Sequence, residues 1–177
     1  MENINQISIA DLDTIKNIID LASSRGAFRG EELQEISVKA WIQNLIQTKW
    51  LNNNIELIAG KEEINLCIKP LAFERAISNL ITNSTKYSKR IKITISTKDS
   101  NVVIEIEDDG NGIKDEEKNL VFKPFYRSDK SRTIDNYANV GLGLAITREI
   151  ILGHHGTISL GDSKDLGGLM VKITVPN

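Results

Sequence analysis

The sequence has one cysteine, two histidines and no long hydrophobic run. The single thiol of Cys67 excludes an intrachain disulfide, and this small side chain is expected in the core. No apolar stretch is long enough to cross a bilayer, and residues 1–13 lack the basic start and apolar centre of a secretory signal. These absences favour a reducing, cytoplasmic setting.

An excess of charge of one sign is also absent. The 177 residues include 22 basic and 24 acidic side chains, which give a formal net charge of −2, and 40% of the residues are hydrophobic. Such a balance argues against nucleic acid as a partner and against bulk attraction to an acidic membrane. Length and composition predict one globular domain with an additional appended element.

Hydrophobic periodicity predicts helices and strands in mixed order. Helical spacing or a helix-opening proline marks residues 4–22, 37–50, 70–85 and 142–152. Short strands are expected at 90–97, 102–107, 157–160 and 169–175, with two more inside 56–68. The strands at 90–97 and 102–107 are predicted to form an antiparallel hairpin. The order predicts an α+β fold, a two-layer α/β sandwich with helices packed on one face of a mixed, mainly antiparallel sheet.

The predicted helix at 70–85 and the residues just after it carry groups suited to a metal ion and to phosphates. Asn79 and Asn83 are four residues apart and share a helical face, and with Glu74 they offer oxygen atoms on one edge to a hard cation such as Mg²⁺. Lys86 adds a positive charge for a phosphate. Taken alone, the pattern is more often that of a solvated helix face.

The segment Asp108–Ile113 directly follows a predicted strand. Its glycines permit a sharp turn and close approach to a ligand. The carboxylate of Asp108 can accept a hydrogen bond from an exocyclic amine such as that of adenine. The alternatives are a plain turn or a fragment of a calcium loop, although the EF-hand spacing is not met.

Two further segments are suited to phosphates. Gly141–Ile146 opens a predicted helix, where N–H groups and the helix dipole favour an anion, but it has neither the dinucleotide fingerprint nor the P-loop ending. Phe122–Arg127 lies in the polar, irregular stretch 114–139, and its aromatic residues can anchor a mobile lid or merely pin a loop. Basic residues that can reach phosphates from this lid are Arg127, Lys130 and Arg132.

In this order and spacing, the segments resemble the nucleotide-binding domain shared by histidine kinases, type II topoisomerases, Hsp90 chaperones and MutL proteins, the GHKL superfamily. The matching boxes are the N box at Asn79–Tyr87, the G1 box at Asp108–Gly112, the F box at Phe122–Phe125 and the G2 box at Gly141–Leu144, with Gly167-Gly168 as the final glycine signature. The F box and the Lys-Tyr ending of the N box are typical of the histidine-kinase branch. The central boxes are similar to those of osmolarity-sensor (EnvZ-type) kinases.

The resemblance implies a Bergerat-type sandwich that binds ATP with Mg²⁺ and donates the γ-phosphate to a histidine. It implies that Asp108 binds the adenine amino group and that Asn83, supported by Asn79, holds Mg²⁺. Phosphates would be contacted by Lys86 and Arg127. The other implied nucleotide-binding positions are Tyr87, Gly110, Gly112, Ile113, Phe125, Gly141, Leu142, Gly143 and Leu144.

The family's phosphoacceptor motif is absent from this sequence. His154 and His155 lie late in the chain, before Gly156, and are expected to be ordinary residues of a helix-to-strand turn. Residues 1–30 are similar to the C-terminal part of a dimerisation helix with its linker, and residues 31–177 to the ATP-binding catalytic domain. The resemblance implies an acceptor histidine on a dimerisation domain, a response regulator as partner, and a homodimeric, inner-membrane sensor as the full-length protein.

One departure from the family pattern keeps other interpretations open. Family G2 boxes usually begin Gly-Thr/Ser-Gly, whereas this chain has Asn139-Val140-Gly141, and Val140 has no hydroxyl for a phosphate. A regulatory module that binds nucleotide without transferring phosphate is therefore the second interpretation. The third, an anti-sigma-type serine kinase, is disfavoured by the F box and by the partial leading helix.

Overall fold

The computed structural model describes residues 30–127 and 141–177. In chain order the elements are β1 (Gln34–Ser37), α2 (Val38–Lys49), β2 (Asn54–Ala59), β3 (Asn65–Ile68), α3 (Pro70–Tyr87), β4 (Arg90–Lys98), β5 (Asn101–Asp108), α4 (Asp115–Lys118), α6 (Gly143–Gly153), β6 (Thr157–Asp162) and β7 (Leu169–Pro176). The predicted helix at 4–22 and the lid residues 128–139 lie outside the described residues. The predicted domain boundary near residue 30 lies at their limit.

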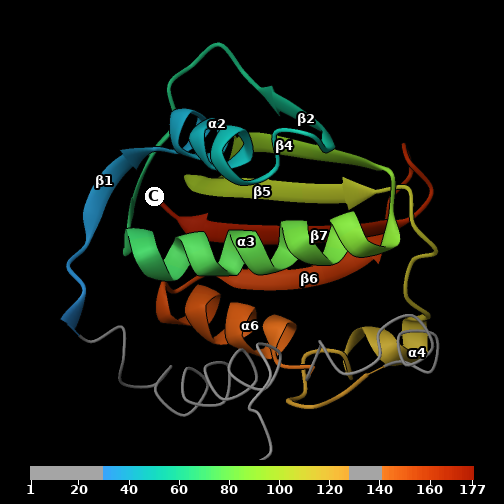
Figure 1. Cartoon of the computed structure of the whole chain (residues 1–177). Helices are drawn as coiled ribbons and strands as arrows, with labels where there is room; N and C mark the ends of the chain where they lie inside the picture. Colours follow the sequence, from blue (N-terminus) through green and yellow to red (C-terminus); the bar gives the residue numbers. More distant parts are fainter. Residues whose placement is uncertain (1–29, 128–140) are drawn as a thin grey trace, which may run out of the picture.

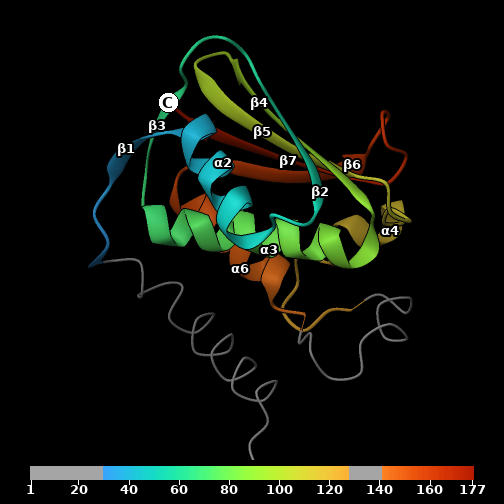
Figure 2. The same cartoon turned by 45° about the horizontal axis from the view of Figure 1, so that its top comes forward.

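Five strands form one sheet in the order β2-β4-β5-β7-β6, and β1 pairs with β3 in a separate antiparallel ribbon. β2 is parallel to β4, while the other pairings of the large sheet are antiparallel. Helices α2, α3 and α6 lie on one face of this sheet (Figure 1, Figure 2). The predicted two-layer sandwich with a mixed, mainly antiparallel sheet is therefore confirmed.

Alternation along β4 decides which of its side chains meet the helices. Ile91, Ile93 and Ile95 are 4%, 0% and 2% exposed, and they lie in the core. Ile93 is opposite Ile106 of β5, which in turn is opposite Val171 of β7. Because successive strand residues point to opposite faces, the residues between these project to the other side of the sheet.

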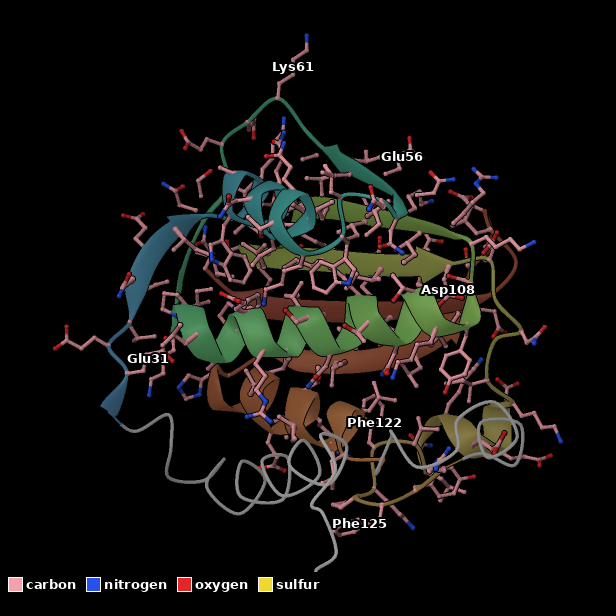
Figure 3. All side chains as sticks on the ribbon, in the orientation of Figure 1. Glu31, Glu56, Lys61, Asp108, Phe122 and Phe125 are labelled. Carbon is pink, nitrogen blue, oxygen red and sulfur yellow. The ribbon has the colours of Figure 1, made fainter. Side chains whose placement is uncertain are left out.

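Helix α3 is the longest helix of the described residues and carries the predicted N box. Pro70 occupies its first turn, where the missing N–H costs little. No local side chain caps this end. Instead, the carboxylate of Glu31 accepts hydrogen bonds from the N–H groups of Leu71 at 2.6 Å and Ala72 at 3.1 Å (Figure 3). The buried apolar face of α3 consists of Ala72, Phe73, Ala76, Ile77, Leu80 and Ile81.

The two strands predicted inside 56–68 both form, but they do not pair with each other. β2 joins the edge of the large sheet, whereas β3 pairs with β1, a strand that the sequence did not predict. Leu66 and Ile68 are 1% and 0% exposed, and Cys67 between them is exposed. The expectation of a buried Cys67 was wrong, because strand alternation outweighs the apolar character of its side chain.

The other elements predicted within the described residues are present with shifts of a few residues at their ends. The predicted hairpin is confirmed as β4–β5, and its turn contains Asp99 and Ser100, both with positive φ. The short helix α4 was not predicted. No helix among the described residues is both long and apolar enough to span a lipid bilayer.

Candidate nucleotide-binding site

The candidate site lies where the C-terminal half of α3, the end of β5 and the start of α6 meet. Asn79 on α3 donates from Nδ2 to the carbonyl oxygen of Gly143 at 3.2 Å, so the N-box helix touches the glycine-rich start of α6. Asp108 ends β5 beside the last turns of α3, where the Ser84 hydroxyl donates to its Oδ2 at 3.1 Å. Figure 3 shows Asp108 at this end of α3. Three of the predicted segments are therefore brought together.

The carboxylate of Asp108 is buried and held by three donors. The residue is 5% exposed, and Oδ1 accepts from the N–H groups of Gly110 at 3.0 Å and Leu169 at 3.1 Å. Ser84 occupies one position on Oδ2. A carboxylate offers about four acceptor positions. The bonds from the described residues therefore leave capacity on Oδ2 for one further donor, such as the exocyclic amine of adenine.

Two glycines allow the chain to pass close to Asp108. A Cβ on Gly168 would lie 2.4 Å from the carbonyl oxygen of Asp108 and 2.5 Å from the nitrogen of Gly110. A Cβ on Gly110 itself would lie 2.9 Å from the carbonyl oxygen of Tyr87. A side chain at Gly168 would push the turn between β6 and β7 away from the turn after β5, and one at Gly110 would push the turn after β5 away from the end of α3. Gly112 follows in the same turn with a φ of 63°.

The carboxamides of α3 lie on one face, and Glu74 does not share it. Asn79 and Asn83 are half-buried, while Lys86 on the same face is exposed. Glu74 precedes Asn83 by nine residues, which is a rotation of about 180° around a helix. Its carboxylate forms an ion pair with Lys49 of α2 at 2.6 Å. The prediction that Glu74 offers oxygen to a cation on the same edge was wrong.

A Mg²⁺ ion at this face would bind carboxamide oxygens, phosphates and water. The described residues contain no group of three or more His, Cys, Asp or Glu side chains that could hold a metal ion. Asn79 uses Nδ2 on Gly143, so Oδ1 is its ligand atom. Mg²⁺ commonly takes few protein ligands and keeps several waters in nucleotide sites. Asn83 and Asn79 fit that mode of binding.

Among the described residues, no side chain caps the backbone N–H groups at the start of α6. Leu142 occupies the cap position and makes no side-chain hydrogen bond to the helix. Its side chain is 2% exposed and belongs to the core, so only its backbone is accessible to a ligand. Gly143 begins the helix, and the side chain of Leu144 packs against the core. A first turn of this kind attracts an anion through its N–H groups and the helix dipole.

The F box contacts the G2 box through the backbone. Phe125 donates its N–H to the carbonyl oxygen of Gly141 at 3.0 Å. Gly141 has a φ of 74°, and a Cβ there would lie 2.6 Å from the carbonyl oxygen of Tyr126. Phe122 is 9% exposed, and the Arg148 guanidinium of α6 lies 5.6 Å from its ring centroid. Phe122 thus anchors the F box to α6, whereas Phe125 is 58% exposed.

The structure describes three further predicted positions. Tyr87 ends α3 and is 39% exposed, Ile113 is half-buried after the G1 turn, and Arg127 is half-buried after the F box. Lys130, Arg132, Asn139 and Val140 lie outside the described residues. The contribution of those four residues stays a prediction.

Sequence reasoning missed two groups that hold Asp108. Ser84 lies on α3 at the spacing of its apolar face and is 5% exposed. A hydroxyl at a core position of an amphipathic helix needs a buried partner, and that signal could have identified it. The N–H of Leu169 comes from the far end of the chain, and no local pattern indicates its contact.

Asp109 is next to Asp108 but has a different task. Its Oδ1 accepts from the N–H groups of Lys89 at 2.7 Å and Arg90 at 2.9 Å, which fixes the turn between α3 and β4. The hydrogen bond from Arg90, followed by that from Lys89, lowers the pKa of Asp109 below its ordinary value. The two adjacent carboxylates therefore offer a matched pair for mutation.

The histidines form the helix-to-strand turn that the sequence predicted. His154 follows α6, and its Nε2 accepts the backbone N–H of Lys69 at 3.0 Å. Its Nδ1 lies 2.7 Å from the carbonyl oxygen of Ile150. His155 is exposed with a φ of 58°. Neither imidazole lies on the face of α3 that carries the carboxamides.

Residues 68–177 match the family described as "Histidine kinase-, DNA gyrase B-, and HSP90-like ATPase". Since the match includes more than half of the chain, the chain belongs to this family of ATPases. Its sequence relatives within the family include sensor histidine kinases. The sensor histidine kinase CpxA of Escherichia coli K12 is 36% identical over 108 residues, which is 60% of this chain and 23% of CpxA.

Solved structures agree with this assignment. The histidine kinase domain of the E. coli osmosensor EnvZ has 31% identity and a TM-score of 0.62, over 85% of this chain and 91% of that domain. Full-length ShkA in complex with AMPPNP has the same fold, with a TM-score of 0.79 at 17% identity, over 93% of this chain and 35% of ShkA. The chain spans about a quarter of CpxA and matches the ATP-binding catalytic domain of such kinases.

Proposed function

We propose that this chain binds ATP with Mg²⁺ and transfers the γ-phosphate to a histidine on a separate dimerisation domain. The observation that carries the proposal is the buried carboxylate of Asp108, held by three donors of the described residues beside the carboxamide face of α3 and the N-terminus of α6. A hydrogen-bond acceptor, a pair of cation ligands and an anion site within one edge of the fold are what an adenosine triphosphate requires.

Each part of the site has a distinct role in this proposal. Asp108 accepts a hydrogen bond from the adenine amino group, and the first-turn N–H groups of α6 bind phosphate oxygens. Asn83 and Asn79 hold Mg²⁺, which would offset phosphate charge when bound. Lys86 contributes a positive charge to the phosphates. The remaining contacts come from Tyr87, Gly110, Gly112, Ile113, Phe125, Arg127, Gly141, Leu142, Gly143 and Leu144.

The reaction requires positioning more than acid–base chemistry from this chain. An imidazole nitrogen of the acceptor attacks the γ-phosphorus, the new N–P bond forms, and the bond to the bridging oxygen of ADP breaks. Phosphoryl transfer is accelerated chiefly by alignment and by stabilisation of charge on the transferred oxygens. The α6 N-terminus and the basic residues supply that stabilisation.

The wider setting follows from the relatives. We propose residues 1–30 as the end of a dimerisation helix with its linker, and residues 31–177 as the catalytic domain. A response regulator would receive the phosphate from the histidine. We propose that this chain is the cytoplasmic domain of a homodimeric sensor anchored in the inner membrane; the relatives' names, sensor kinase and osmosensor, support the sensory role.

The first test compares two adjacent substitutions. Asp108→Asn replaces an acceptor oxygen with an amide donor, and we expect ATP affinity to fall at least about tenfold. Asp109→Asn is the control, because its Oδ1 can still accept from the N–H groups of the turn after α3 and the residue is exposed. Titration calorimetry with and without Mg²⁺ measures both. Equal affinity of Asp108→Asn and the unmodified chain would remove the basis of the proposal.

The second test separates a kinase from a regulatory module. The chain is mixed with Mg²⁺, γ-labelled ATP and a dimerisation domain that carries an acceptor histidine. We expect acid-labile, base-stable phosphate on that domain. Tight ATP binding without transfer would instead support the regulatory module.

A further inference from the structure

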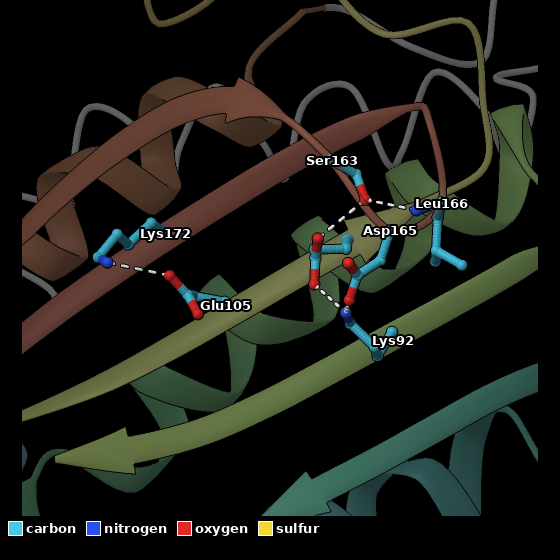
Figure 4. A network of polar contacts seen from close by, with 7 residues as sticks. Lys92, Glu105, Ser163, Asp165, Leu166 and Lys172 are labelled. Atoms are coloured by element: carbon cyan, nitrogen blue, oxygen red, sulfur yellow. Dashed lines mark hydrogen bonds and ion pairs between the residues drawn. The ribbon is translucent and has the colours of Figure 1, made fainter.

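A polar network lies on the sheet face opposite the helices (Figure 4). Lys92 of β4 pairs with Oε2 of Glu107 of β5 at 2.6 Å and also with Asp165. Ser163 donates its hydroxyl to Oε1 of Glu107 at 2.8 Å and accepts the N–H of Leu166 at 2.9 Å. Both oxygens of Glu107 are therefore engaged, one by a cation and one by a hydroxyl.

The Lys92–Glu107 pair and Ser163 are more buried than a surface ion pair, whereas the side chain of Asp165 is 68% exposed. The side chains of Lys92 and Glu107 are 13% and 11% exposed, and Ser163 is 4% exposed. Hydrogen bonds to Asp165 and then to Glu107 raise the pKa of Lys92, so its ammonium group stays charged at neutral pH. A charge in such surroundings costs free energy unless it is fully paired, so its geometry is tightly specified.

Ser163 connects this network to the turn between β6 and β7. Its N–H donates to the carbonyl oxygen of Gly168 at 2.8 Å, and its carbonyl oxygen accepts the N–H of Gly167 at 3.0 Å. The same turn then reaches Asp108. Gly168 donates its N–H to the carbonyl oxygen of Asp108 at 3.0 Å, and Leu169 donates to the Asp108 carboxylate at 3.1 Å.

Glu107 and Asp108 are consecutive residues on opposite faces of β5. The outer face fixes Glu107 through Lys92 and Ser163, and the helix face presents the carboxylate of Asp108. We propose that Ser163, with Glu107 and Lys92, is a positioning residue for adenine recognition: it holds the 163–168 turn that orients the carboxylate of Asp108. This inference rests on the proposed role of Asp108.

A second ion pair on the same face provides a matched control. Glu105 lies two residues before Glu107 on β5 and pairs with Lys172 of β7 at 2.9 Å (Figure 4). The side chains of Glu105 and Lys172 are 27% and 37% exposed, and this pair lies along the strands, away from the 163–168 turn. Glu105→Gln therefore removes a charge from the same sheet face without touching the support of Asp108.

The test compares ATP with purine riboside triphosphate, which has no exocyclic amine and so cannot use the carboxylate of Asp108. We expect Ser163→Ala to weaken ATP binding about tenfold and to change the analogue's affinity little, because one charge-assisted bond loses its alignment. Glu107→Gln keeps an acceptor for the Ser163 hydroxyl and should retain more discrimination than Ser163→Ala. Glu105→Gln should leave both affinities unchanged.

The deciding readout is the ratio of the affinity for ATP to that for purine riboside triphosphate, since a general loss of stability would weaken the binding of both nucleotides alike. If Ser163→Ala does not fold, Lys92→Met releases Glu107 and should reduce the ratio in part. A collapsed ratio in Asp108→Asn with an intact ratio in the folded Ser163 or Lys92 variant overturns this inference and leaves the proposed function standing. If the unmodified chain does not distinguish the two triphosphates, the role of Asp108 and this inference both fail.

Discussion

The imidazole of His154 joins the end of α6 to the start of α3. Nε2 accepts the Lys69 N–H at 3.0 Å, and so the proton sits on Nδ1 and is donated to Ile150. The ring packs edge-on against Phe73, with centroids 5.5 Å apart. Burial lowers the pKa of His154 below 6.5, despite the opposing effect of the bond to Ile150. The folded structure therefore requires the neutral ring.

This imidazole predicts a pH dependence of stability. Because the folded-state pKa is below that of the unfolded chain, protonation favours unfolding. The stabilisation is complete above about pH 6.5 and is lost progressively as the pH falls below it. We expect His154→Gln to flatten the slope of the free energy of unfolding against pH in this range, measured by urea titration at several pH values.

His155→Asn is the control for this experiment. His155 is exposed with a φ of 58°, which asparagine tolerates, so this variant should retain the original slope. An unchanged slope in His154→Gln would show that another group governs the dependence.

At the scale of elements, α3 is capped by a residue forty positions away. Glu31 accepts from the N–H groups of Leu71 and Ala72, the donors that a local capping side chain would normally satisfy. The negative carboxylate also faces the positive end of the helix dipole. The segment before β1 therefore contributes to the stability of the helix that carries Asn79 and Asn83.

We expect Glu31→Ala to lower the free energy of unfolding by about 1 kcal/mol, the usual effect of losing a helix cap. Chemical denaturation measures this difference. Glu32→Ala alters the exposed neighbour and serves as the comparison. Equal stability of the two variants would mean that water replaces the Glu31 carboxylate without cost.

Helix α3 also illustrates what a sequence can reveal about an element. Its length and apolar face follow from residues three and four apart, and they were predicted from that spacing. The direction of Glu74 could be worked out from the same geometry. The partner of Ser84 could not, because Asp108 approaches from another strand. Spacing specifies the faces of a helix, while tertiary contacts decide what each face meets.

The same division holds for strands. Isoleucine alternation predicted β4, and a polar turn predicted its hairpin with β5. β1 has four residues, of which the first two are exposed, and its partner β3 lies about thirty residues on. A strand so short and so exposed has no pattern strong enough to predict. Its pairing depends on the rest of the fold.

At the scale of the whole molecule, the two faces of the large sheet have different roles. The helix side of the sheet contains the core and the candidate site, and the opposite side contains the network of Lys92, Glu107 and Ser163. The N, G1, F and G2 boxes predicted the site on the helix side. Their carboxamides, acid and glycines indicate a nucleotide site by their combined order and spacing, although none does so singly. No local sequence pattern indicated the polar network on the opposite side, since each of its residues is of a type common on protein surfaces.

Nucleotide should stabilise the entire domain if the site is as proposed. A ligand present at about 100 times its dissociation constant stabilises the folded state by about 2.7 kcal/mol. We expect a rise in Tm with ATP and Mg²⁺, and a smaller rise when EDTA removes the metal. Differential scanning fluorimetry measures both. An identical Tm in all three conditions would contradict binding at this site, and Asp108→Asn should abolish most of the shift.

The outward position of Cys67 has a practical use. It is the sole thiol in the sequence, and it is exposed on β3, three residues before α3 begins. Helix α3 has 18 residues and is therefore about 27 Å long, with Asp108 beside its far end. A maleimide dye attached there, without any engineered cysteine, would sit at a distance suited to energy transfer from a fluorescent nucleotide.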